Sequence, residues 1–78
     1  MEKEKVLQDL EYEFICGFIR VRKENNLTQQ ALADMSGVIR EQIAKIENSL
    51  NSPQLRSLIK VLEPIGYTVR IMPIKKGE

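Results

Sequence analysis

Histidine and cysteine, which commonly serve in acid–base, nucleophilic and metal chemistry, are nearly absent from this 78-residue chain. It contains no histidine, and Cys16 is its single cysteine. A catalytic pair built on histidine, or a metal site of histidine and cysteine ligands, is therefore excluded. The sequence shows no clustered carboxylates and offers no base to activate Cys16, which we expect to be a buried structural thiol. We expect no enzymatic activity, no cofactor and no metal.

The composition is that of a small globular protein, with 42% hydrophobic and 29% charged residues. We expect residues 1–78 to form a single domain. A lone cysteine cannot form an internal disulfide, which favours a reducing cytoplasm. No apolar run approaches the length of a membrane span, and the charged start "MEKEKVLQDLEYE" is unlike a signal peptide. We therefore expect a cytoplasmic protein without a membrane partner.

The most informative stretch is "LTQQALADMSGVIREQIAKIENS", residues 27–49. It predicts a short helix, a glycine turn and a second short helix. Thr28 can cap the first helix, Ala33 is small enough for a close helix crossing, and Gly37 suits the turn. A plain helical bundle would also need apolar residues, but it would not need this whole set at these intervals. The arrangement is that of a helix-turn-helix, in which the second helix lies in the DNA major groove.

Hydrophobic periodicity predicts four helices that position this motif. They run from about Lys3 to Asn25, from Thr28 to Ser36-Gly37, from about Arg40 to Glu47, and from Ser52-Pro53 to Pro64-Gly66. The first helix should bury an apolar stripe formed by Val6, Leu7, Leu10, Phe14, Phe18 and Val21. Ile15 and Ile19 should widen this stripe on one side. The third should bury Ile43 and Ile46 beside Val38. The fourth, capped by Ser52, should bury Leu55, Leu58, Ile59 and Leu62.

The stretches "RKENNLTQQALADMSGV" and "IAKIENSLNSPQLRSLIKVL" resemble the Cro/CI-type (XRE) helix-turn-helix domain. The resemblance covers roughly residues 14–63 and implies an all-α, lambda-repressor-like bundle of about four helices that binds DNA. In that family an arginine late in the first helix pairs with a glutamate late in the recognition helix. The matching residues are Arg22 and Glu47, whose expected role is structural, because a bidentate partner makes a partly buried charge tolerable.

Residue-by-residue transfer from the family implies a set of DNA contacts. Gln29, beside the capping Thr28, would touch a phosphate, and Asn48, Asn51 and Ser52 would meet the backbone on the far side. Base edges would be faced by Arg40, Glu41, Ala44 and Lys45, with Ile39 before them. Arginine can fork onto guanine, glutamate can accept from cytosine, and alanine leaves room for a thymine methyl. Arg56 and Lys60 could add phosphate contacts. For each residue the alternative is an ordinary solvated helix face.

Several features depart from the family pattern. Ile39 stands where serine or threonine is usual before the recognition helix, and it cannot cap that helix. It could touch thymine methyls or belong to a protein interface. Ala31 stands where a glutamate would complete a capping box. The net charge is only +1, divided as −1, −1 and +3 over residues 1–26, 27–50 and 51–78. Affinity for DNA would therefore depend on the placement of individual contacts and on the binding of two copies related by a two-fold axis.

The stretch "GYTVRIMPI", residues 66–74, has the period-2 pattern of a β-strand in which Tyr67, Val69 and Ile71 alternate with polar or flexible residues. A single strand lacks a ladder partner within its own chain. The same strand of a second copy, antiparallel about a two-fold axis, would satisfy it. We expect Tyr67, Val69 and Ile71 to form this homodimer interface. A C-terminal strand of this kind resembles the HigA- and HipB-like antitoxins, which repress their own operon and hold a toxin.

These observations favour a transcriptional repressor that binds a palindromic operator on double-stranded DNA as a homodimer. Two alternatives stay open, and an enzyme is a remote third because the sequence shows no evident acid–base machinery. The chain could be the antitoxin of a type II toxin–antitoxin pair, with a cognate toxin as a further partner. It could also be a protein-interaction module that has lost DNA binding, which the near-neutral charge and Ile39 allow.

Overall fold

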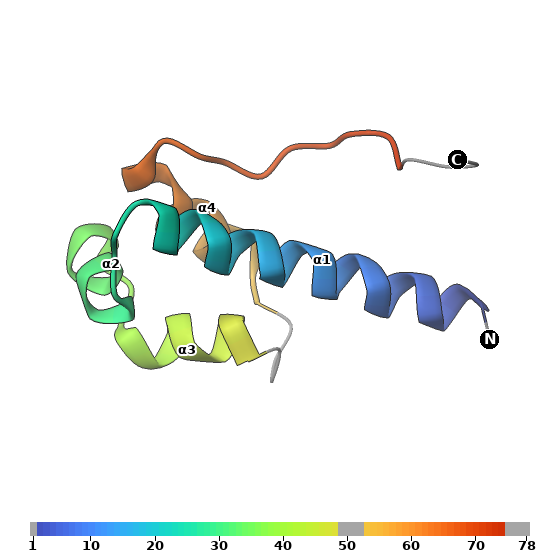
Figure 1. Ribbon diagram of the computed structural model, residues 1–78, viewed down its shortest axis with the longest axis horizontal. Coiled ribbons are helices and arrows are strands. Elements are labelled where there is room, and N and C mark those ends of the chain that lie inside the picture. Colours follow the sequence, from blue (N-terminus) through green and yellow to red (C-terminus); the bar gives the residue numbers. More distant parts are fainter. Residues whose placement is uncertain (1, 49–52, 75–78) are drawn as a thin grey trace.

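The structure, a computed structural model, describes residues 2–48 and 53–74, with side chains from residue 4 (Figure 1). Its elements are α1 (Glu2–Glu24), α2 (Gln29–Ser36), α3 (Arg40–Asn48), α4 (Leu55–Leu62) and the 3₁₀ turn η1 (Glu63–Ile65). The order of the four α-helices matches the prediction. Among the described residues, no helix has the length and apolar character needed to cross a bilayer.

The core lies where α2, α3 and α4 meet the C-terminal half of α1. Leu32, Ile43, Ile46 and Val61 are fully buried there. Ile43 and Ile46 were predicted to face inward beside Val38, and all three are buried. Ala33 is also buried at the crossing of α2 and α3, where a larger side chain would separate the helices.

Both ends of α2 follow the sequence prediction. The hydroxyl of Thr28 accepts a hydrogen bond from the Ala31 N–H at 3.0 Å, which satisfies one free donor of the first turn. Gly37 ends the helix with a φ of 79°, in the left-handed region. Its N–H donates to the Ala33 carbonyl at 2.9 Å. These two contacts fix the length of α2 and therefore the point from which α3 departs.

The start of α4 differs from the prediction. The predicted cap, Ser52, lies outside the described residues, and α4 begins only at Leu55, after an extended Gln54 that provides no side-chain cap. The buried face also differs from the predicted one, since Leu58, Val61, Leu62 and Ile65 follow the helical spacing toward the core. Leu55 and Ile59, which were predicted to be buried, are exposed.

Helix α1 is longer than the bundle that it packs against. Its C-terminal half buries Ile15, Phe18 and Arg22. Residues 4–14, which we call the α1 overhang, project beyond the bundle (Figure 1). The overhang accounts for four exposed members of the predicted stripe: Val6, Leu7, Leu10 and Phe14. Cys16 is also exposed, contrary to the prediction of a buried thiol, because it lies on the face of α1 turned away from Ile15 and Phe18.

Residues 67–74, which we call the C-terminal segment, form no regular secondary structure. The segment leaves Gly66 in an extended path and runs back beside α1, toward the side on which α1 begins (Figure 1). The Tyr67 N–H donates to the Leu62 carbonyl at 3.1 Å, and Val69 packs partly against the core. The strand expected over residues 66–74 is therefore not formed within the described part of a single chain, and its pairing in a homodimer stays a prediction.

Candidate nucleic-acid interface

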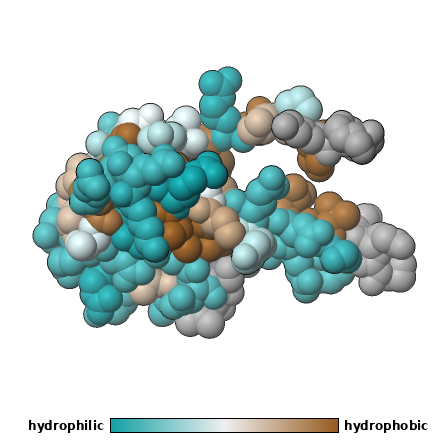
Figure 2. Space-filling model, in the orientation of Figure 1, coloured by the Kyte–Doolittle hydropathy of each residue, from teal (hydrophilic) through white to brown (hydrophobic). Residues whose placement is uncertain are grey.

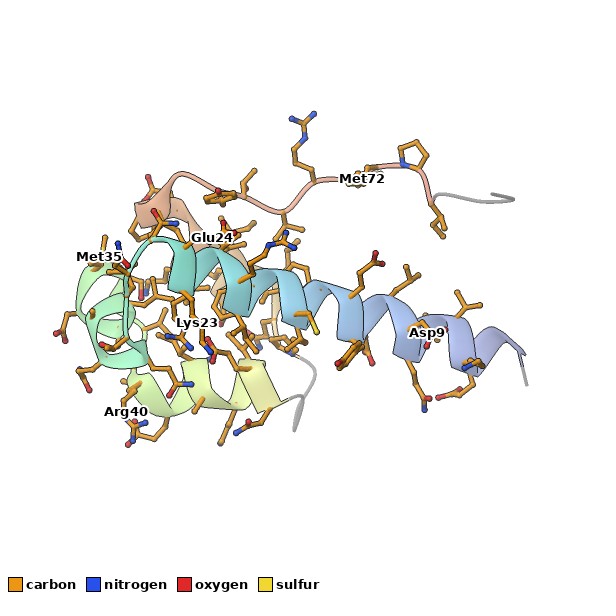
Figure 3. The ribbon with its side chains drawn as sticks, viewed as in Figure 1. Asp9, Lys23, Glu24, Met35, Arg40 and Met72 are labelled. Carbon is orange, nitrogen blue, oxygen red and sulfur yellow. The ribbon has the colours of Figure 1, made fainter. Side chains whose placement is uncertain are left out.

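The two faces of α3 differ sharply in burial. Ile43 and Ile46 hold one face in the core. The opposite face exposes Arg40, Glu41 and Lys45, and its last residue, Asn48, is exposed as well. Ala44 is half-buried between the faces, and Arg40 points outward from the first turn (Figure 3). Because the apolar face of α3 is packed in the core, its outer face is held in a fixed position. The guanidinium, carboxylate and ammonium groups on that outer face can form hydrogen bonds with base edges.

An ion pair ties the end of α3 to α1. The Arg22 guanidinium donates from Nε to Glu47 Oε2 at 2.6 Å and from Nη2 to Oε1 at 3.0 Å. Its remaining nitrogen, Nη1, donates to the Leu27 carbonyl at 2.7 Å. The side chains are only 10% and 6% exposed. Because the guanidinium and carboxylate satisfy each other in a bidentate geometry, this charge pair fixes α3 against α1.

Gln29 extends this pair toward the exposed face. Its Nε2 donates to Glu47 Oε1 at 2.9 Å, and its Oε1 accepts from Arg40 Nη1 at 3.5 Å. The carboxylate can only accept a hydrogen bond, so it turns the amide nitrogen inward and the amide oxygen toward Arg40. The sequence reasoning placed Gln29 on a phosphate and missed this internal contact. The spacing of eleven residues from Gln29 to Arg40 crosses the turn, and only the packed geometry shows that they meet.

Ile39 lies immediately before α3 and is 64% exposed. Its carbonyl accepts from the Gln42 N–H at 3.0 Å, so its backbone begins the helix although its side chain cannot cap it. The side chain borders a shallow groove of about 340 Å³ between α3 and the residues before α4. The groove is lined by Ile39, Glu41, Gln42, Lys45, Ile46, Pro53 and Gln54. An apolar group thus stands at the edge of the polar face of α3.

The remaining predicted site residues are distributed differently. Thr28 is exposed at the start of α2, and its hydroxyl already accepts from Ala31. Arg56 is exposed on α4 and borders a separate shallow groove with Met35, Ser36 and Lys60, away from the groove beside Ile39. Asn51 and Ser52 lie outside the described residues.

Gln42 is a further contact that the sequence reasoning did not identify. Its Nε2 donates to Ser57 Oγ at 3.1 Å and links α3 to α4. The sequence signal for this contact is a polar residue, Gln42, directly before the buried Ile43. Nothing in the spacing identifies Ser57 as the partner of Gln42. The position of α3 is thus set by one polar link to α4, one ion pair to α1 and the apolar core between them.

Comparisons with known proteins agree with this geometry. A helix-turn-helix family model, HTH_3, matches residues 19–71. A Haemophilus influenzae protein described as an uncharacterized HTH-type transcriptional regulator is 35% identical over 74 residues, which cover 95% of this chain and 76% of that protein. A solved structure described as a toxin–antitoxin module from Streptococcus pneumoniae superposes with a TM-score of 0.75 at 32% identity, covering 95% of this chain and 82% of that one.

The family match spans α2, the glycine turn, α3, α4 and η1, together with the last turns of α1. The chain belongs to the HTH_3, or XRE-type, helix-turn-helix family.

Proposed function

We propose that this protein is a sequence-specific DNA-binding transcriptional regulator, and specifically a repressor, whose α3 enters the major groove. The observation that carries the proposal is the position of α3. Its inner face is buried, its end is ion-paired to α1, and its outer face presents Arg40, Glu41 and Lys45. A recognition helix needs this combination, because base discrimination depends on groups held in a fixed register.

Each proposed base contact has a specific chemical reason. Arg40 can donate two hydrogen bonds to guanine O6 and N7, and Glu41 can accept from cytosine N4. The methyl group of Ala44 leaves room for a thymine methyl, while Lys45 can read guanine or neutralise a phosphate. Backbone contacts are assigned to the exposed Thr28 and Asn48, and to Gln29, Asn51, Ser52 and Arg56.

The weak overall charge supports the proposal that the protein binds DNA as a homodimer. A chain with a net charge of +1 releases few counterions on DNA, so a single copy gains little non-specific affinity. Two copies related by a two-fold axis would place two α3 helices on half-sites one DNA turn apart and would read a palindromic operator. In this proposal residues 14–63 are the DNA-binding core. Residues 66–74 form the dimerisation strand, with Tyr67, Val69 and Ile71 in the interface.

Selection of DNA fragments from a random-sequence library by the purified protein tests DNA binding. We expect enrichment of a palindrome whose half-site centres are separated by about one helical turn. The matched control is the Arg40→Ala, Lys45→Ala double variant, which alters only exposed side chains and should enrich nothing specific. Absence of any enriched sequence with the wild type would refute the proposal and would favour a protein-interaction module.

Sedimentation tests the dimer. Val69→Pro removes a backbone donor from the C-terminal segment, so it should leave residues 14–63 folded while the dimer dissociates. Affinity for the selected operator should then fall steeply, because one half-site offers too few contacts. A wild type that sediments as a monomer with and without operator would contradict the homodimer.

A second candidate function is supported by the likeness to the toxin–antitoxin module. The chain would then be an antitoxin that neutralises a toxin and also represses its own operon. Co-expression with the product of the neighbouring gene tests this candidate. The antitoxin function predicts that this product arrests growth alone, that growth returns when both are made, and that the two proteins co-purify. If the product of the neighbouring gene does not arrest growth and does not co-purify with this protein, the antitoxin function is rejected.

A further inference from the structure

Two exposed apolar surfaces face each other at one end of the molecule. The first is the stripe on the α1 overhang formed by Val6, Leu7, Leu10 and Phe14. The second is on the C-terminal segment, where Ile71 is 100% exposed. Figure 2 shows the two parts standing apart, with hydrophobic (brown) surfaces on the sides that face the space between them. A surface of this kind on a small protein marks an interaction site.

The C-terminal segment directs its apolar side chains toward this space. Val69 packs partly against the core beside α1. Side chains two positions apart in an extended chain point to the same side, so Ile71 continues that direction over the overhang. Ile71 nevertheless touches nothing in the single chain, since it is completely exposed. The space between Ile71 and the overhang is therefore wide enough for further side chains.

Backbone groups add a second requirement. Apart from the Tyr67 N–H, no backbone hydrogen bond of the segment is made among the described residues. The occupant should supply backbone donors and acceptors as well as apolar side chains, and an extended chain supplies both. An extended segment of eight residues spans about 26 Å, so it is long enough to run along the whole overhang, whose eleven helical residues span about 16 Å.

Charge favours one occupant. Residues 1–14 carry five acidic and two basic side chains, whereas residues 66–78 carry three basic and one acidic. At 100° per residue, the acidic groups of the overhang fall on both sides of its apolar stripe, with Asp9 and Glu13 on one side and Glu4 and Glu11 on the other. An apolar stripe flanked by carboxylates suits an apolar strand flanked by cations. The C-terminal segment, with Arg70 inside it and Lys75 and Lys76 after it in the sequence, has this character.

We propose that the space is filled by the C-terminal segment of a second copy of this chain. In the dimer, each segment pairs with its counterpart and each α1 overhang covers the segment of the other copy. This inference rests on the proposed homodimer and extends it, since it assigns the overhang a role as the cover of the strand pair. Association of the two copies about the two-fold axis then buries the backbone of the segments and the apolar stripes of both overhangs.

Leu7→Glu tests the cover. Leu7 is exposed in the single chain, so the variant should keep the fold and the thermal transition of the core. A carboxylate on the stripe should raise the dimer dissociation constant measured by sedimentation by about 10- to 100-fold. The matched control is Tyr12→Glu, which places the same charge on the opposite, exposed face of the overhang and should leave the dissociation constant unchanged. Equal effects of the two variants, or none from either, would overturn the proposal.

Crosslinking distinguishes the occupants. In a Cys16→Ser background, a chain with Leu10→Cys is mixed with a chain with Ile71→Cys, and a chain with both changes is oxidised alone at high dilution. We expect a disulfide between the mixed chains and none within the diluted chain. A disulfide within one chain would show that the segment packs on the overhang of its own chain. A dimer that forms neither disulfide would indicate that a different protein covers the stripe. Both results would overturn this inference while leaving operator binding, and thus the proposed function, intact.

Discussion

Removing the Glu47 carboxylate should destabilise the protein more than any surface change. The carboxylate accepts three hydrogen bonds, two from Arg22 at 2.6 and 3.0 Å and one from Gln29 at 2.9 Å. In Glu47→Ala the Arg22 guanidinium, which is 10% exposed, keeps only its bond to the Leu27 carbonyl. Stranding a buried partner in this way costs about 3–5 kcal/mol of unfolding free energy.

That loss is large on the scale of the whole chain. A domain of this size has a total stability of roughly 4–12 kcal/mol. Each kilocalorie corresponds to about 4–8 °C in the melting temperature, so Glu47→Ala should lower it by roughly 12–40 °C. The partners can also be replaced together. In the Arg22→Met, Glu47→Leu double variant no charge is stranded, and stability should recover much of what either single change removes.

Thermal and urea denaturation followed by far-ultraviolet circular dichroism measure these changes. Glu41→Ala is the matched control, because it deletes an exposed carboxylate from the same helix and should cost less than about 1 kcal/mol. A loss in Glu47→Ala no larger than in Glu41→Ala would refute the reasoning. It would mean that water, rather than Arg22, solvates the carboxylate in the folded protein.

Three further predictions concern α2 and the polar face of α3. Thr28→Ala should lower the unfolding free energy by about 0.5–2 kcal/mol in urea denaturation, while Thr28→Asn, which keeps a capping oxygen, should restore most of it. Arg40→Ala should weaken binding to the selected operator by about 1–3 kcal/mol and hardly affect random DNA at the same salt concentration; equal losses would identify a phosphate contact. If Ile39 packs on a thymine methyl, replacing that thymine by uracil should cost the wild type about 0.8 kcal/mol and Ile39→Ala almost nothing. No effect of uracil on the wild type would assign Ile39 to a protein interface.

The sequence predicted the central elements well because local signals there agree with packing. Thr28 and Gly37 mark the ends of α2 by hydrogen bonding and by backbone conformation, which depend on neighbours within a few residues. Predictions failed where burial depends on distant partners. Val6 and Leu7 continue the apolar stripe of α1, yet the bundle ends before it reaches them. On α4 the packing of the helix against the core buries Val61 in place of the predicted Ile59.

The candidate site shows the same division. The polar outer face of α3 could be predicted, because the inward positions of Ile43 and Ile46 determine which residues point outward. The link from Gln29 to Glu47 and Arg40 could not, because it depends on how α2 crosses α3 in three dimensions. Secondary-structure patterns give the faces of helices, but they do not give the rotamers of polar side chains between them.

The hydrogen bonds of Gln29 have a consequence for how this protein could evolve new operators. Arg40 donates to Gln29 Oε1 at 3.5 Å, and Gln29 in turn donates to Glu47, so the orientation of the Arg40 side chain is coupled to the Gln29 amide. Glu41 and Lys45 are exposed and make no side-chain hydrogen bond within the described residues. Substitutions at these two positions carry little stability cost. Descendants of this chain can therefore drift to new target sequences through Glu41 and Lys45, while a change at Gln29 would also release the Arg40 side chain from its contact.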